Sequence, residues 1–131
     1  ATDRGIRVEV DPQPAVVAGD PARLRQLVMI LVDNAIRHSP TDGRVGVAVR
    51  ANGGGASLVV EDDGPGIRAE DLPHVFERFW RGANGIRASG SGIGLAVVAE
   101  LVAVHQGTVI AGNVSAGGVR LTVTLPAAPA E

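Results

Sequence analysis

The stretch "RVGVAVRANGGGASLVVEDDGPGI", residues 44–67, decides how this chain folds. It contains two runs rich in valine and other apolar residues, 44–51 and 56–62, separated by the tetrapeptide "NGGG". Two such runs on either side of a glycine-rich turn predict an antiparallel hairpin. The second run ends in three adjacent acids, residues 61–63, directly before a Gly-Pro-Gly turn. Adjacent carboxylates repel one another, so this cluster is a candidate functional site.

Three further strands are predicted on either side of this hairpin. Residues 6–10, "IRVEV", alternate apolar and polar side chains, which is typical of a half-buried strand. Residues 107–114 and 118–126 resemble a closing hairpin. The chain therefore contains about five strands, joined mostly by hairpins.

Two long helices are predicted, one within residues 20–40, with Pro40 beyond its end, and one at residues 93–105. Asp20 can cap the free amides of the first helix, and Pro21 suits its first position. An apolar stripe at helical spacing runs along that helix. Its members are Leu24, Leu27, Val28, Leu31 and Ala35. Gly107 is placed to end the second helix, and a third, short helix is expected around residues 69–76.

Hairpins rather than regular strand–helix alternation favour an α/β (α+β) two-layer sandwich. We expect one mixed, mostly antiparallel sheet with about three helices on one face. The length of 131 residues suits a single domain, which we assign to residues 1–126. Residues 127–131, "AAPAE", are expected to be a disordered tail.

Composition excludes several kinds of site. The chain has no cysteine, which rules out disulfides, thiolate metal sites and a cysteine nucleophile. All 12 basic residues are arginine, so a Walker-type phosphate loop, which needs lysine, is also excluded. The net charge is −2 with no basic block, which argues against nucleic acid as a partner. No apolar run reaches the length of a membrane span.

Two glycine-rich segments could bind a nucleotide. "GSGIGL", residues 90–95, opens the predicted second helix, whose free amides and dipole attract anions. A plain tight turn is the alternative there. Asp62 ends an apolar strand, where its carboxylate should be partly buried and in need of a donor. The exocyclic amino group of a purine would supply one, whereas an ordinary Asp-Gly turn is the alternative.

Asn34 is the third candidate, on the flank of the apolar stripe of the first helix. Arg37 lies on the same side, one turn later. The pair could hold a metal ion and a phosphate. The alternative for a single asparagine in a helix is a hydrogen bond to a neighbouring helix or to the backbone.

Taken together and in order, these stretches resemble the ATP-binding catalytic domain of bacterial sensor histidine kinases, in the GHKL superfamily with its Bergerat-type fold. "DPARLRQLVMILVDNAIRHSP" (20–40) is similar to the N box and "VVEDDGPGI" (59–67) to the first glycine box. "LPHVFERFWRG" (72–82) resembles the F box and "GSGIGLAVVAELVAVHQGTV" (90–109) the second glycine box. "AGGVRLTVTLP" (116–126) resembles the final hairpin. The likeness spans nearly the whole chain.

The resemblance implies ATP and Mg²⁺ as cofactors and assigns roles in the N box. Asn34 matches the residue that binds the Mg²⁺ bridging the phosphates, and an amide oxygen suits that cation. Arg37 matches a phosphate contact. His38 occupies a position near the adenine, where an imidazole packs more weakly than a tyrosine. The role of Asn34 and Arg37 is both catalytic and nucleotide-binding.

In the first glycine box the matching adenine reader is Asp62, with Gly64, Gly66 and Ile67 around the nucleotide. A bond from the adenine amino group to this carboxylate would contribute about 1.5–3 kcal/mol. Guanine presents a carbonyl there, so GTP should be rejected strongly. Asp63 is expected to face solvent or to cap the turn. Both Asp63 and Glu61 are expected to be solvated bystanders.

Between the glycine boxes the resemblance implies a lid, from about Glu77 to Gly92, with Phe76 and Phe79 as hydrophobic pins. Arg81 matches a position that reaches the γ-phosphate in related kinases; a solvated surface arginine is the alternative. The second glycine box adds further nucleotide-binding candidates. These are Ser91, Gly92, Ile93, Gly94 and Leu95.

One position departs from the family pattern. The N box often has a polar residue one turn before Asn34, but here that residue is Ile30. In hydrolysing members such as gyrase B a glutamate there activates water, and isoleucine cannot act as a base. We therefore expect poor ATP hydrolysis and transfer of phosphate to a protein acceptor. The change at Ile30 also predicts weaker Mg²⁺ binding.

The implied acceptor is a histidine on a separate dimeric helical domain, and a cognate response regulator is the implied next partner. His38 lies in the site, while His74 and His105 are expected at the surface or at a helix end. We expect a cytoplasmic, monomeric fragment of a membrane-bound sensor kinase, without membrane contact of its own or autophosphorylation. Two alternatives stay open: an anti-sigma-factor-type protein-serine kinase, and a degenerate nucleotide-binding module that only regulates a partner.

Overall fold

The computed structural model describes residues 7–11, 19–40, 42–52, 55–67, 69–77, 94–114 and 117–126. They form five strands, two α-helices and one 3-10 helix. In chain order these are β1 (Arg7–Asp11), α1 (Pro21–His38), β2 (Arg44–Asn52), β3 (Gly55–Asp62), η1 (Leu72–His74), α2 (Gly94–Val104), β4 (Thr108–Asn113) and β5 (Val119–Pro126).

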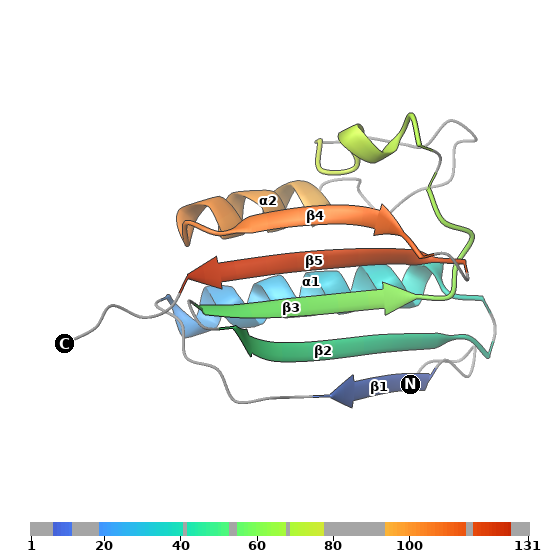
Figure 1. The fold of residues 1–131 in the computed structure, drawn as a ribbon, viewed down its shortest axis with the longest axis horizontal. Helices are drawn as coiled ribbons and strands as arrows, with labels where there is room; N and C mark the ends of the chain where they lie inside the picture. The colour runs from blue at the N-terminus through green and yellow to red at the C-terminus, as the bar shows by residue number, and fades with distance from the viewer. Residues whose placement is uncertain are drawn as a thin grey trace.

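The five strands form one mixed sheet in the order β1-β2-β3-β5-β4 (Figure 1). β1 runs parallel to β2, while the β2–β3, β3–β5 and β4–β5 pairs are antiparallel. The hairpin predicted from residues 44–62 is the β2–β3 pair, which begins with Val45 opposite Asp62. The mixed, mostly antiparallel sheet predicted from the sequence is thus confirmed.

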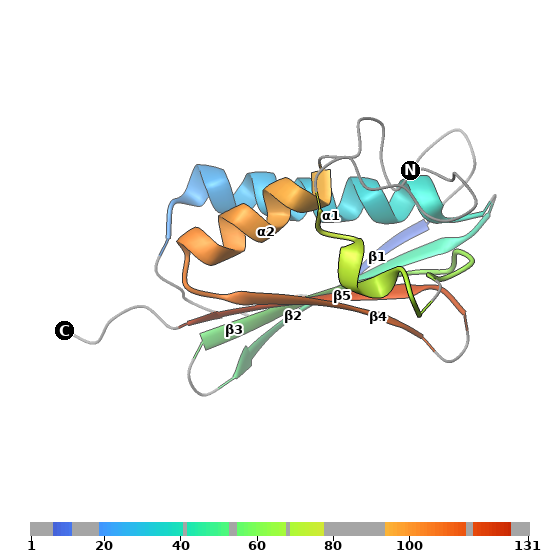
Figure 2. The ribbon, with the colours of Figure 1, turned by 90° about the horizontal axis from the view of Figure 1, so that it is seen from above.

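Both α-helices cover the same face of the sheet, so the fold has two layers (Figure 2). Where a third helix was expected, the structure has only the short 3-10 helix η1, near the β4 edge of the sheet (Figure 1). A single turn forms there because Pro73 fits its start, whereas the surrounding residues have no sustained apolar period.

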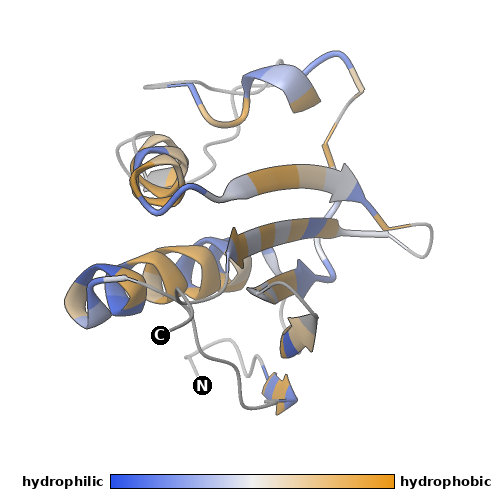
Figure 3. Ribbon diagram, turned by 60° about the vertical axis from the view of Figure 1, so that its left-hand side comes forward, coloured by the Kyte–Doolittle hydropathy of each residue, from blue (hydrophilic) through white to orange (hydrophobic). Residues whose placement is uncertain are grey.

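The core lies between these two layers. Burial alternates residue by residue along β3, and hydropathy alternates along β5 in Figure 3, as expected for a sheet with one covered face. On the helical side Leu27 and Leu31 of α1 are almost fully buried, and so is Val98 of α2. Of the predicted stripe on α1, Leu27, Leu31 and Ala35 belong to the buried core, and Leu24 and Val28 pack against it.

Helix α1 begins as its sequence predicts. The Asp20 side chain accepts a hydrogen bond from the Ala22 N–H, and Pro21 is the first helical residue. Helix α2 ends differently from the prediction. Gln106, not Gly107, adopts the left-handed conformation, with φ of 59°, while Gly107 donates its N–H to the Val102 carbonyl. Gly107 is required for another reason, since a Cβ there would lie 2.3 Å from the Thr124 carbonyl oxygen.

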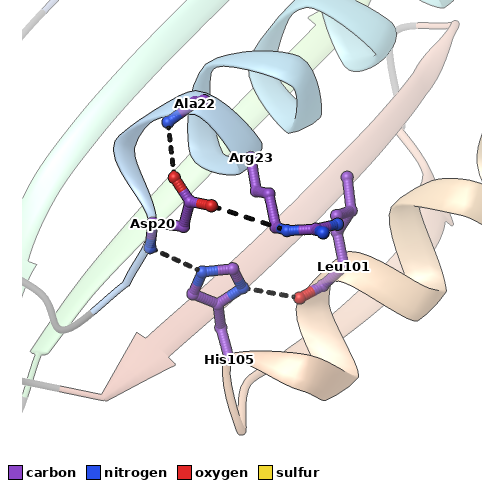
Figure 4. A network of polar contacts seen from close by, with 5 residues as sticks. All are labelled: Asp20, Ala22, Arg23, Leu101 and His105. Carbon is purple, nitrogen blue, oxygen red and sulfur yellow. Dashed lines mark hydrogen bonds and ion pairs between the residues drawn. The ribbon is translucent and has the colours of Figure 1, made fainter.

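His105 joins the end of α2 to the start of α1 (Figure 4). Its Nδ1 lies 2.8 Å from the Leu101 carbonyl, and its Nε2 accepts the Asp20 N–H at 3.2 Å. The ring is 8% exposed. His105 therefore lies at the helix end, one of the two positions expected for it, and it is buried between the helices. His74 is exposed, as predicted.

Across the part of the chain that the structure describes, neither helix combines the length and apolar character needed to cross a membrane. The predicted tail, residues 127–131, lies outside the described residues.

Candidate functional site

The predicted site residues gather where several elements end. Helix α1 finishes at His38, β3 finishes at Asp62, and β5 begins at Val119, all at the same end of the molecule (Figure 1). Val119 donates a hydrogen bond to Asp62, and the turn after β3 packs against the carbonyl of His38. Segments far apart in the sequence thereby form one polar region at the edge of the core.

Asp62 is the most deeply buried acid of this region, with 5% of its surface exposed. Its Oδ1 accepts two backbone hydrogen bonds, from Gly64 N at 2.8 Å and Val119 N at 3.2 Å. Burial raises the pKa of the carboxyl above its usual value, an effect that these two hydrogen bonds and the nearby His38 only partly oppose. Among the described residues no donor reaches Oδ2, so this oxygen could accept a hydrogen bond from a ligand.

Two close backbone approaches fix Asp62 in place. A Cβ at Gly64 would lie 2.4 Å from the carbonyl oxygen of His38, so the turn after β3 can rest on the end of α1 only with glycine. Gly118 has φ of +100°, and a Cβ there would lie 1.9 Å from the Asp62 carbonyl oxygen. Gly64 was predicted from the sequence, but Gly118 was not, because its contact depends on the pairing of β5 with β3.

Asn113, the last residue of β4, was also missed. Its Oδ1 accepts the Ile67 N–H at 2.8 Å, and its Nδ2 donates to the Ile67 carbonyl at 2.7 Å. The predicted nucleotide-binding residues Gly66 and Ile67 are thus held to the edge strand of the sheet. An asparagine at the end of a strand carries no signal of such a contact across 46 residues.

Asn34 lies in α1, one turn before His38, and is 4% exposed. Its Oδ1 is a buried oxygen without a hydrogen-bond partner in the described structure. Burying such an oxygen without a donor costs about 1–3 kcal/mol. The helix–helix hydrogen bond considered as an alternative is therefore absent at this oxygen in the part of the chain described, so the oxygen could serve as a ligand of a cation.

Arg37 and His38 follow on the last turn of α1. Arg37 is exposed, and its Nε lies 2.8 Å from Asp33 Oδ2 in an ion pair along the helix. A phosphate at Arg37 would have to share the guanidinium with Asp33. His38 is half-buried, and its charge influences the carboxyl of Asp62.

Asp63 is exposed, as expected, and Glu61 is half-buried, but each of these neighbours of Asp62 has a structural partner. The Oδ2 of Asp63 accepts the Arg44 N–H at 2.9 Å, which caps the start of β2. Glu61 forms an ion pair with Arg120 on the open face of the sheet. The strand alternation correctly separates both from Asp62, but each has a structural partner.

The remaining candidates divide into two groups. Gly94 is the first residue of α2, Leu95 is buried in the core, and Phe76 is half-buried against it. Most of the proposed lid, residues 78–92, lies outside the described residues. So do the candidates Phe79, Arg81, Ser91, Gly92 and Ile93.

Ile30 lies one turn before Asn34 and lines a shallow depression of about 410 Å³ on the outer face of α1. Ala22, Arg25, Gln26, Met29 and Asp33 complete its lining. None of the predicted nucleotide-binding residues belongs to it. Ile30 offers no proton acceptor to this surface.

Comparison with known proteins identifies the family. The sequence profile of the histidine kinase-, DNA gyrase B- and HSP90-like ATPases matches residues 19–129. The chain is 39% identical to the sensor histidine kinase component HK1 of Mycobacterium tuberculosis over 126 residues, which are 96% of this chain and 73% of that protein. The chain belongs to the histidine-kinase-type ATPases.

Other relatives of this ATPase domain support the same conclusion. Sensor protein SphS of Synechococcus elongatus is 43% identical over 127 residues, and the match covers 90% of this chain but 31% of SphS. The chain thus spans about a third of that relative. The solved structure of the mycobacterial sensor histidine kinase MprB superposes with a TM-score of 0.86 at 37% identity, covering 96% of this chain and 86% of the other. The fold predicted from the sequence is confirmed.

Proposed function

We propose that this domain binds Mg²⁺–ATP and donates the γ-phosphate to a histidine on a separate phosphoacceptor domain in two-component signalling. The observation that carries the proposal is the buried carboxylate of Asp62, 5% exposed and without a described donor on Oδ2, in a chain of the histidine-kinase-type ATPase family. Each group of residues in the site supports one part of this function.

Adenine would be recognised at Asp62. The exocyclic amino group can donate to Oδ2 while the Gly64 and Val119 amides keep Oδ1 satisfied. A carbonyl at the same position, as in guanine, would face an acceptor with another acceptor. A site built to form a hydrogen bond with one ligand group binds an analogue that lacks this group much more weakly. ATP should therefore bind far more tightly than GTP.

The phosphates would lie toward Asn34, Arg37 and the start of α2 at Gly94. Asn34 fits a Mg²⁺ ligand because its buried Oδ1 has no partner in the described structure, and hard cations prefer such oxygens. No group of three or more acidic, histidine or cysteine side chains that could hold a metal occurs among the described residues. Asn34 would therefore bind an ion that also keeps phosphate and water ligands. When bound, the ion would offset negative charge on the phosphates.

Transfer to a protein, rather than to water, is supported by Ile30. The residue one turn before Asn34 cannot deprotonate a water molecule, so rapid hydrolysis would lack its base. The acceptor histidine, the response regulator, and the roles of Arg81 and the lid in approaching the γ-phosphate remain part of the proposal. The similarity to sensor histidine kinases supports them.

Incubation with γ-labelled ATP and a separately made phosphoacceptor domain tests the function. Acid-labile phosphohistidine on the acceptor is the expected product, and Asp62→Asn should abolish it. Phosphoserine would instead support the kinase of anti-sigma-factor type. Nucleotide binding without any transfer would support a regulatory module. Rapid phosphate release by the domain alone would contradict the inference from Ile30.

A further inference from the structure

We propose that Asn113, at the end of β4, is a positioning residue that sets how strongly Asp62 recognises the adenine amino group. Asn113 does not itself contact the nucleotide in this proposal. It acts on the segment 62–67, which we call the adenine loop. The inference rests on the proposed binding of ATP at Asp62.

The adenine loop is fixed at both ends by one pair of residues. At its start, the Val119 N–H donates to Asp62 Oδ1 at 3.2 Å. At its end, the Asn113 amide binds both the N–H and the carbonyl of Ile67, at 2.8 Å and 2.7 Å. Asn113 and Val119 face each other in the β4–β5 ladder. The end of this one hairpin therefore determines where the loop begins and where it returns.

The side-chain amide of Asn113 makes the two hydrogen bonds to Ile67 that a neighbouring β-strand would otherwise make. It offers the acceptor and the donor that a neighbouring backbone would offer to Ile67, so it pairs with the loop as an added β-residue would. Gly66 has φ of +85°. Because glycine adopts positive and negative φ about equally well, the backbone at Gly66 does not fix the loop by itself, and the hydrogen bonds from Asn113 do so. Oδ1 of Asn113 also lies close to Gly66, since a Cβ there would be 3.0 Å from it.

The consequence for recognition follows from the geometry of a hydrogen bond. Such a bond weakens steeply when its direction is lost, and the Gly64 amide that orients Asp62 belongs to the same loop. If the loop is released at Ile67, Asp62 keeps its burial and its bond from Val119 but loses part of the constraint on the direction of Oδ2. In the proposed function the phosphates lie toward Asn34, Arg37 and the start of α2, so their contacts would not depend on that direction.

The test measures coupling between Asn113 and one ligand group. Binding of ATP and of purine riboside triphosphate, which lacks the amino group, is measured by calorimetry for wild type and Asn113→Ala. We expect ATP binding to weaken about tenfold, comparable to one or two lost hydrogen bonds, and binding of the analogue to change less than about twofold. Asn113→Asp keeps only the bond from the Ile67 N–H. It should also bind ATP more weakly than wild type does, with little change in its affinity for the analogue. Thr108→Ala, an exposed change at the other end of β4, is the matched control and should alter neither affinity.

Equal losses for the two nucleotides, or no loss, would overturn the positioning role, even if Asn113→Ala lowers the melting temperature. If the substitution prevents folding, Asn113→Asp gives the same comparison. Asp62→Asn separates this inference from the proposed function. Should that variant bind ATP as tightly as wild type does, the adenine site itself is wrong. Should it lose ATP while Asn113→Ala does not, only the role of Asn113 fails.

Discussion

Replacing Asp62 with asparagine should separate binding from stability. The change keeps the size of the side chain and an oxygen that can accept the Gly64 and Val119 amides, but it removes the charged acceptor for the adenine amino group. A hydrogen bond from adenine to a charged acceptor contributes about 1.5–3 kcal/mol, which corresponds to about 10- to 150-fold in the dissociation constant. The new amide nitrogen also faces a donor, so the measured loss should lie at or above the upper figure.

Stability should change little at neutral pH. The amide nitrogen would be buried without an acceptor, but the cost of desolvating a carboxylate, which raises the pKa of Asp62, disappears at the same time. We expect the free energy of unfolding at pH 7 to stay within about 1 kcal/mol of wild type. Calorimetry with ATP and urea unfolding followed by circular dichroism measure the two effects on the same samples.

The difference in stability between wild type and Asp62→Asn should depend on pH in a definite direction. A carboxyl whose pKa is higher in the folded state than in the unfolded chain reduces stability when it is ionised in both, at high pH. That penalty disappears as the pH falls through the raised pKa toward 3.8, the value for the unfolded chain. Wild type should therefore gain stability relative to Asp62→Asn across this range. Asp63→Asn makes the same change of charge at an exposed neighbour and should leave ATP affinity unchanged. An Asp62→Asn protein that binds ATP within threefold of wild type would refute the assignment.

Three further changes test other parts of the domain. Asn34→Ala should remove the difference between ATP affinity with Mg²⁺ and with a chelator, which calorimetry in the two buffers measures; a difference as large as in wild type would exclude Asn34 as the ligand. Gly64→Ala places a methyl group 2.4 Å from the His38 carbonyl and should cost about 1–3 kcal/mol of unfolding free energy, whereas Gly46→Ala, whose methyl group meets nothing within 4 Å, should not. Gln106→Gly should raise the unfolding free energy by about 0.5–1 kcal/mol, because it relieves a left-handed residue with φ of 59° after α2 while adding freedom to the unfolded chain; an unchanged or lower melting temperature would contradict this.

The fold was predictable because its signals are local and repeated. Burial along β3 alternates as its sequence does, and α1 begins at the residues that suit a helix start, Asp20 and Pro21. Both signals depend only on neighbours within one or two turns. The end of α2 shows the limit of such reasoning. Gly107 is a residue type that often ends a helix, yet the left-handed residue is Gln106. Glycine is required at position 107 for a different reason, because β5 passes so close that a Cβ would collide with it.

The candidate site was predictable in part for a different reason. Asp62 and Asn34 violate the usual pattern of their elements, one as a charge at the end of an apolar strand and one as an amide beside an apolar stripe. The residues that hold them were not predictable. Asn113 reaches Ile67 and Val119 reaches Asp62 only because β4 pairs with β5 and β5 with β3, so their roles exist only once the strand order is known.

Among the described residues, two that would meet the ligand carry an evident energetic cost in the free domain. Asn34 buries an oxygen without a partner in the described structure, and Asp62 buries a carboxylate whose pKa is raised by that burial. At Asn34 an apolar side chain, like that of Leu31 nearby, would avoid this cost, whereas at Asp62 the carboxylate also satisfies the Gly64 and Val119 amides. Binding of Mg²⁺–ATP would satisfy both atoms at once and would add about 2.7 kcal/mol of stability at a hundred times the dissociation constant. The same two side chains that weaken the free domain would thus make its most stable form the one that carries ATP.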